Sequence, residues 1–179
     1  MPLDLIKEVE GVQIVLVILP NETYSNSIME IAKLLSNKFD SICYVTMNKL
    51  YDGLIKNLEN NKVNINKFCF IDTITKTADP NFKGAKNCRR ISSPSNLTEI
   101  SLSIGQELKT RKPKCILYDS LSTMLFYKED QIVTQFVHSL ISKLRLTDCI
   151  TLFTALEGDT EKQMIQNLGM LVDKIIHYK

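Results

Sequence analysis

The sequence lacks the patterns of several common functional sites. No two of its five cysteines form a Cys-x-x-Cys pair, and only His138 and His177 offer imidazole ligands. Zinc and thioredoxin-like sites need closely spaced ligands, so we expect neither, and no metal or cofactor is predicted. The cysteines are expected to act as small buried apolar side chains. There is also no Gly-x-Ser-x-Gly elbow, His-Glu-x-x-His zinc helix or Gly-x-Gly-x-x-Gly fingerprint.

Long apolar runs are missing as well. The longest, from Ile14 to Leu19, is far too short to span a bilayer. The N-terminus has no basic segment followed by an apolar one, so we expect no signal peptide. A net charge of +2 is too small to indicate nucleic acid or an anionic membrane as a partner. We therefore expect a soluble, cytoplasmic protein.

What the chain does contain is a regular alternation of apolar runs of strand length with segments of helical periodicity. This alternation is typical of an α/β fold with a mainly parallel sheet. Strands are expected at 12–19, 41–47, 67–73, 114–118, 149–155 and 172–178. With 179 residues, we predict one domain over 1–179, a three-layer sandwich of a sheet flanked by helices.

Helix signals lie between these strands. Ser27-x-x-Glu30 and Asn96-x-x-Glu99 are expected to cap two helices. The clearest helix is expected at 130–146, where seven apolar residues form one wide stripe. The segment 75–94 has neither periodicity, and we predict one long irregular loop there, because loops of this length in a small domain are functional or disordered.

The most informative stretch is residues 115–125, which read CILYDSLSTML. It has the form of a buried strand that ends in Asp119 and is followed by small hydroxyl residues. In open α/β sheets the carboxyl ends of the strands face the ligand crevice, so an acid at this position is a candidate site residue. The alternative is that Asp119 only caps a backbone turn.

This stretch resembles the Walker B motif of RecA/KaiC-type ATPases, in which a strand ends in Asp-Ser. The similarity extends to the order of elements, to the helix start at 93–97 and to the segment 171–174 before the last strand. It implies a RecA-like fold, in which such an aspartate helps to hold Mg²⁺ on a nucleotide. More closely, the chain resembles small single-domain archaeal proteins described as inactivated RecA-superfamily ATPases with a suggested signalling role.

The phosphate loop that should accompany this motif is degenerate. A Gly-x-x-x-x-Gly-Lys-Ser/Thr loop wraps backbone N–H groups and a lysine around the phosphates. Here segment 20–27 reads PNETYSNS, so Pro20 and Ser25 replace the glycines and Asn26 replaces the lysine. Pro20 also removes a backbone donor, and Glu22 adds a negative charge. Only Ser27 fits the motif.

The resemblance also implies a catalytic glutamate at the end of the second strand, where segment 44–49 has no carboxylate. We therefore predict no catalytic residue and a pseudo-ATPase acting as a regulatory or signalling module. Its partner would be a protein, either a second copy or an active RecA/KaiC-like ATPase. The vestigial nucleotide site would comprise Asn26, Ser27, Asp119 and Ser120.

Two alternatives remain open. The first is an ATP-binding protein or weak ATPase with a non-standard phosphate site near Asn26, Ser27 and Asp119. The second is a nucleic-acid-binding recombinase paralogue that uses a basic loop. The basic residues of that loop are Lys83, Lys86, Arg89 and Arg90. The small net charge favours a solvated loop over a nucleic-acid site.

Overall fold

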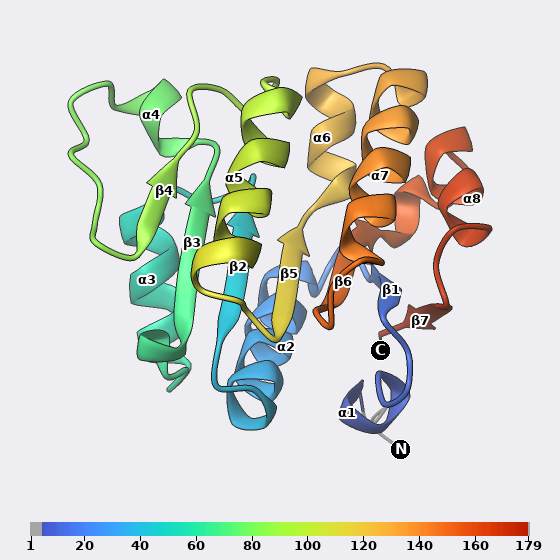
Figure 1. Ribbon diagram of the computed structural model, residues 1–179, viewed down its shortest axis with the longest axis horizontal. Coiled ribbons are helices and arrows are strands. Elements are labelled where there is room, and N and C mark those ends of the chain that lie inside the picture. Colours follow the sequence, from blue (N-terminus) through green and yellow to red (C-terminus); the bar gives the residue numbers. More distant parts are fainter. Residues whose placement is uncertain (1–4, 179) are drawn as a thin grey trace.

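Seven parallel strands form the centre of the structure, a computed structural model that describes residues 5–178 (Figure 1). The strand order is β4-β3-β2-β5-β6-β1-β7. In chain order the strands are β1 (Ile14–Leu19), β2 (Ile42–Thr46), β3 (Phe68–Asp72), β4 (Cys88–Arg90), β5 (Cys115–Asp119), β6 (Ile150–Leu156) and β7 (Lys174–His177). All neighbouring strands pair in parallel.

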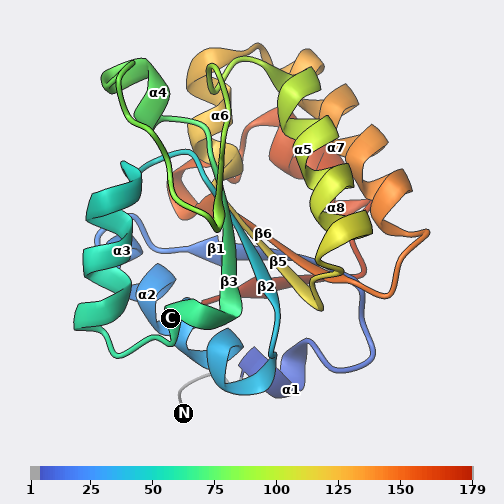
Figure 2. The same cartoon turned by 60° about the vertical axis from the view of Figure 1, so that its left-hand side comes forward.

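Helices cover both faces of the sheet. They are α1 (Leu5–Glu8), α2 (Tyr24–Lys38), α3 (Tyr51–Asn60), α4 (Thr75–Ala78), α5 (Leu97–Thr110), α6 (Leu121–Tyr127), α7 (Asp130–Leu144) and α8 (Gln163–Gly169), with 3₁₀ turns η1 (Ile65–Lys67) and η2 (Glu157–Asp159). Figure 2 shows α2 and α3 on one face and α5, α7 and α8 on the other. This is a single α/β domain of three layers, and the predicted fold class is confirmed.

The core follows from strands that are covered on both faces. All six residues of β1 are buried, as a continuously apolar strand in a parallel sheet should be. One apolar cluster joins the sheet to α2 and α3, and a second joins it to α5 and α7. All five cysteines are free, and four of them are buried in these clusters, as expected. Each large apolar side chain buried in this way stabilises the fold by about 1.5–3 kcal/mol.

The segment 75–94 is not wholly irregular, and this prediction is wrong in part. It contains the short helix α4 and the strand β4, which pairs with β3 at the edge of the sheet. Cys88, which falls within the predicted irregular loop, lies on β4 and packs half-buried against the core. A three-residue strand with two arginines shows no alternation of apolar and polar residues, so the pattern that reveals longer strands was absent.

One of the two predicted helix caps is also wrong. Helix α2 begins at Tyr24 after Thr23, so Ser27 lies inside the helix, where its hydroxyl is 3.2 Å from the Thr23 hydroxyl. The other cap is confirmed, because the Asn96 side chain accepts a hydrogen bond from the Glu99 amide at 3.1 Å. The Ser27-x-x-Glu30 spacing matched a cap by chance, and the Tyr24 start has no such signal.

The topology brings the carboxyl ends of all seven strands to one edge of the sheet. The chain leaves β1 through α2 and enters β2, which lies on the far side of β5 and β6. Thr46 of β2 is in register with Asp119 of β5. Crevices in open α/β sheets form where the strand order reverses in this way, beyond the carboxyl ends. None of the helices between residues 5 and 178 has the length and apolar character needed to cross a membrane.

Candidate nucleotide site and its surroundings

Asp119 is the centre of a closed hydrogen-bond network. Its side chain is buried, with a relative exposure of 1%. Oδ1 accepts a hydrogen bond from the Tyr24 hydroxyl and another, of 2.8 Å, from Nδ2 of Asn48. Oδ2 accepts one of 2.6 Å from the Tyr44 hydroxyl. These partners come from the start of α2, from β2 and from the loop after β2. All three are side chains, so the alternative that Asp119 caps a backbone turn is wrong.

This environment determines the charge of the carboxyl group. Burial raises the pKa of Asp119 to about 8. Three donors act in the opposite direction, because hydrogen bonds to a carboxylate favour its charged form, so desolvation is the larger effect. Magnesium needs deprotonated oxygen ligands with room for water around the ion. A largely protonated carboxyl enclosed by two tyrosines and an amide does not offer them.

The network continues into α6. Ser120 is the N-cap of that helix, and its hydroxyl accepts a hydrogen bond from the Thr123 amide at 3.3 Å. The Thr123 hydroxyl in turn donates to Oδ1 of Asn48. Asn48 therefore joins Asp119 to the start of α6. The Ser120 hydroxyl caps this helix and is not directed at a ligand. The Asp119–Ser120 peptide bond is cis.

The segment in the phosphate-loop position forms the first turn of α2. The backbone N–H groups of Asn26 and Ser27 both donate to the carbonyl of Thr23 at 2.9 Å. Ser27 is buried, and the Asn26 side chain is exposed. A phosphate-binding loop needs free N–H groups aimed at the ligand, and these two are already used. The structure thus brings Ser120 next to Asp119, but Asn26 and Ser27 are occupied in the helix.

A lysine that the sequence did not single out approaches this helix start. Nζ of Lys49, in the loop after β2, lies 3.3 Å from the hydroxyl of Ser25. The side chain is partly buried, and burial lowers its pKa. The Walker motif places its lysine in the phosphate loop itself, at position 26 here, so it gives no signal for a lysine in the loop after β2. Tyr44 offered only a general signal, since a hydroxyl inside a buried strand needs a partner but does not indicate which one.

The predicted basic loop is partly engaged within the protein. Arg89 on β4 forms an ion pair with Glu107 of α5 at 3.1 Å, and Arg90 lies over the ring of Phe82 at 5.9 Å. Lys83 and Lys86 are exposed. Two of the four predicted contact residues are therefore used within the protein: Arg89 ties β4 to α5, and Arg90 packs on Phe82 in the loop before β4.

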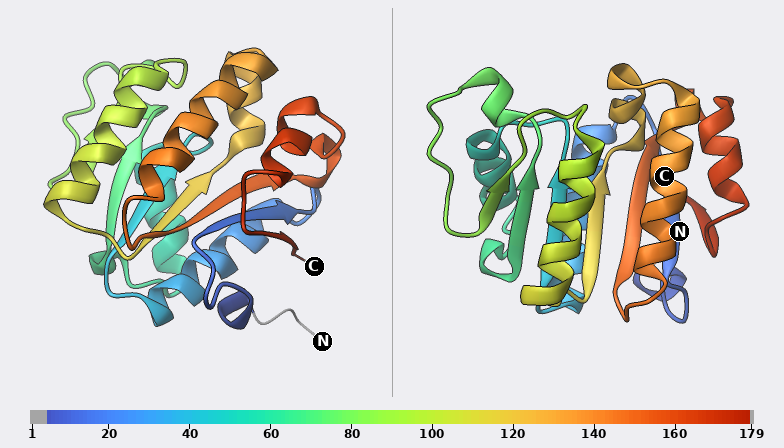
Figure 3. Two further views of the ribbon diagram at one scale, coloured as in Figure 1. Left: turned by 45° about the vertical axis from the view of Figure 1, so that its right-hand side comes forward. Right: turned by 45° about the horizontal axis from the view of Figure 1, so that its top comes forward.

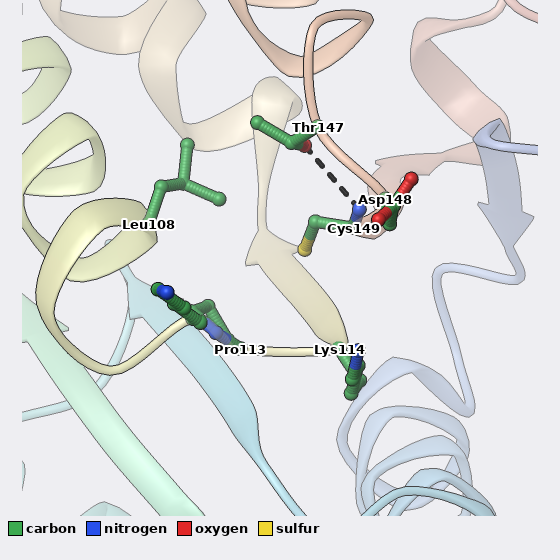
Figure 4. Close-up of a pocket in the computed structure, with 7 residues that line it drawn as sticks. Leu108, Pro113, Lys114, Thr147, Asp148 and Cys149 are labelled. Carbon is green, nitrogen blue, oxygen red and sulfur yellow. Dashed lines mark hydrogen bonds between the residues drawn. The ribbon is translucent and has the colours of Figure 1, made fainter.

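Cavities lie both at the amino ends and at the carboxyl ends of the strands. Figure 4 shows one of about 200 Å³ at the amino ends of β5 and β6, where Leu108 and Pro113 face Cys149. Burial raises the pKa of the Cys149 thiol to about 12, so this cysteine is a weak nucleophile. Three further cavities lie around β1, β6 and β7, toward their carboxyl ends. No group of three or more His, Cys, Asp or Glu side chains within residues 5–178 is arranged to hold a metal ion.

Comparison with known proteins agrees with this architecture. The KaiC-like protein PH0186 from the hyperthermophilic archaeon Pyrococcus horikoshii superimposes with a TM-score of 0.64 over 91% of this chain and 69% of that chain. At 13% identity the likeness establishes the fold alone, which is RecA/KaiC-like. No curated protein matches the sequence. Residues 64–178 match the model of a family of unknown function, DUF7504, and the chain therefore belongs to that family.

Proposed function

We propose that this protein is a catalytically inactive RecA/KaiC-like ATPase homologue that acts as a regulatory or signalling protein-interaction module. One observation carries the proposal: the carboxyl of Asp119, which would face Mg²⁺ in an active relative, is enclosed by Tyr24, Tyr44 and Asn48. Both carboxyl oxygens are therefore already engaged by donors from the protein itself.

The remaining catalytic groups are missing too. Position 26 holds asparagine in place of the lysine, and segment 44–49 at the end of β2 has no carboxylate to activate water. Phosphoryl transfer depends almost entirely on such positioned charges, and removing one costs orders of magnitude in rate. Losing several together removes the activity.

The surface supports a protein partner. Phe126, Tyr127 and Ile132, around the turn between α6 and α7, have relative exposures of 80%, 42% and 42%. Grouped exposed apolar side chains are typical of protein interfaces. The partner is a second copy of the chain or an active RecA/KaiC-like ATPase. The resemblance to inactivated archaeal homologues supports a cytoplasmic signalling role.

Two assays test this function. Phosphate release from MgATP by the purified protein should equal that of Asp119→Ala, and a rate above that of the variant would contradict inactivity. Light scattering at high protein concentration tests self-association. A dimer or ring supports pairing with a second copy, whereas a strictly monomeric mass leaves an active relative as the partner.

A second candidate is an ATP-binding protein with a non-standard phosphate site, and Lys49 favours it. Its ammonium group, 3.3 Å from Ser25 Oγ, supplies a positive charge near the start of α2, where the dipole also favours anions. In this candidate, Lys49→Met would abolish ATP binding while Lys56→Met, an exposed lysine on α3, would not. If the wild-type protein binds no ATP, the candidate is excluded, and if it binds ATP that neither variant weakens, Lys49 is not part of the site.

A further inference from the structure

A groove runs along the carboxyl ends of β6, β1 and β7, beside the Asp119 network. Its largest cavity, about 570 Å³, is lined by Pro20, Asn21, Glu22, Thr23, Glu157 and Gly158. A second cavity of about 350 Å³ shares Pro20 and Glu157 with the first. A third, of about 210 Å³, shares Ile18 and His177 with the second and extends between β7 and α8. We call these three adjoining cavities the β1–β7 groove; Figure 3 shows β1, β7 and α8 side by side.

The groove carries negative charge that the protein itself does not neutralise. None of the residues that line its three cavities is a lysine or an arginine. Glu22 and Glu157 are exposed, and within residues 5–178 neither side chain has a hydrogen-bond or ion-pair partner. Other acids nearby are satisfied: Asp159 pairs with Lys162 at 2.9 Å, and Glu30 accepts a hydrogen bond from Tyr178 at 3.1 Å.

The two glutamates are presented from loops that are tied together. The amide of Gly158 donates to the Asn21 side chain at 3.0 Å, which connects the loop after β6 to the loop after β1. A Cβ on Gly158 would lie 2.8 Å from the Asn21 side chain, so a larger residue at position 158 would displace that side chain. Glu22 directly follows Asn21, and Glu157 directly precedes Gly158. The contact between Asn21 and Gly158 therefore brings both glutamates to the same cavity.

Apolar surface continues from the acidic cavity. Ile18 and Pro20 line the middle of the groove, and Ile165 and Ile175 line its far end between β7 and α8. Ile175 has a relative exposure of 44%. A ligand that follows the groove would therefore meet two carboxylates first and an apolar wall next.

We propose that the β1–β7 groove binds a basic segment of a protein partner, with an arginine or lysine between Glu22 and Glu157 and an apolar side chain against Ile165 and Ile175. Charge complementarity selects this occupant, since carboxylates pair well with a guanidinium group and repel phosphates. The inference rests on the proposed function, because it places the partner where an active relative would hold its nucleotide.

The proposal is tested by nuclear magnetic resonance on the full ¹⁵N-labelled chain. The probe is a capped heptapeptide that alternates leucine and arginine, and the control peptide alternates leucine and glutamate. We expect the arginine peptide to shift the amides of Asn21, Glu22, Glu157 and Gly158, and the glutamate peptide to shift none of them. Shifts that are absent, scattered over the surface or equal for both peptides would overturn the proposal.

Two matched double variants test whether Glu22 and Glu157 supply the charge that binds the peptide. Glu22→Gln/Glu157→Gln should weaken binding of the arginine peptide by about tenfold, as expected for two partly exposed ion pairs. Glu59→Gln/Glu129→Gln removes the same charge from exposed acids elsewhere and should leave binding unchanged. Equal weakening by both pairs would mean that only net charge matters, which contradicts a defined groove.

Adding MgATP to the same samples separates the two proposals. If ATP shifts the amides around Tyr24 and Asp119, the crevice holds a nucleotide, and the ATP-binding candidate replaces the closed site whatever the peptide does. If neither ATP nor the arginine peptide causes shifts, the groove inference fails and the inactive function stands.

Discussion

Asp119 and Glu157 lie at the carboxyl ends of neighbouring strands, yet they are opposite in character. Asp119 ends β5, is 1% exposed and accepts hydrogen bonds from three side chains. Glu157 directly follows β6, is exposed, and has no side-chain partner within residues 5–178. The comparison shows that position at the ligand edge does not make an acid available. The donors that surround it decide whether it faces a ligand or the protein.

The difference arises from how α2 begins. Its first residue, Tyr24, follows β1 by only a few positions, and its hydroxyl reaches across to Asp119. Asn21, just before the helix, binds the loop after β6 and leaves Glu22 and Glu157 facing the same cavity. One short segment thus closes the crevice over β5 and leaves it open over β6.

The largest expected effect is a difference between the two acids in how much unfolding free energy is lost when each is replaced by alanine. Asp119→Ala leaves two tyrosine hydroxyls and an amide without their acceptor, and it should lower the free energy of unfolding by about 3 kcal/mol. Glu157→Ala should change it by less than about 0.5 kcal/mol, as for an ordinary surface position. Urea denaturation of both variants measures this. Equal losses would remove the contrast between the closed and the open acid.

The pH dependence of stability sharpens the comparison further. The unfolded pKa of Asp119 is 3.8 and its folded pKa is about 8, so between these values the folded state binds one more proton. The free energy of unfolding should therefore fall as pH rises through this window, by up to about 1.4 kcal/mol per pH unit. Asp119→Asn removes this slope and keeps the oxygen acceptor.

The measurement is the difference in unfolding free energy between wild type and Asp119→Asn at pH 5.5 and 7.5. Taking the difference cancels the contributions of other groups, including Asp173, whose pKa is lowered to about 2 by Arg145. A wild-type slope that Asp119→Asn retains would mean that Asp119 is ionised in the folded protein.

A smaller effect is expected from the residue that closes the site. Tyr24→Phe removes one hydrogen bond to Asp119 and keeps the ring, so it should lower the free energy of unfolding by about 1 kcal/mol. It should not create ATP binding, because the phosphate-loop lysine and the free amides are still missing. Thermal denaturation with and without MgATP tests both statements. Stabilisation of the variant alone by MgATP would show that Tyr24 is a removable cover over a competent site.

The smallest effect concerns the basic loop. Lys83→Ser/Lys86→Ser should not alter binding to single-stranded DNA, because we expect the wild type itself to bind none at low salt. Filter binding over a salt series provides the measurement. Salt-sensitive micromolar binding that the double variant loses would revive the nucleic-acid alternative.

The fold was predictable because long apolar strands and amphipathic helices carry clear periodicities. The six strands expected from the sequence all form, whereas β4 was missed because three residues with two arginines have no periodicity. Asp119 was also identifiable, since an acid at the end of an apolar run stands out. Its partners Tyr44 and Asn48 were not, because strand pairing and loop path bring them to Asp119 from about seventy residues away. The β1–β7 groove joins Glu22 to Glu157 across a still longer separation in the chain.

Isothermal titration of the protein with MgATP, repeated with Asp119→Ala, tests the central claim most directly. A closed site predicts no binding heat at millimolar ATP for either protein. Binding tighter than about 100 µM, near −5 to −6 kcal/mol, that disappears in Asp119→Ala would contradict the claim. In that case Asp119 contributes to binding of the metal-bound nucleotide, and the protein is an ATP-binding member of its family.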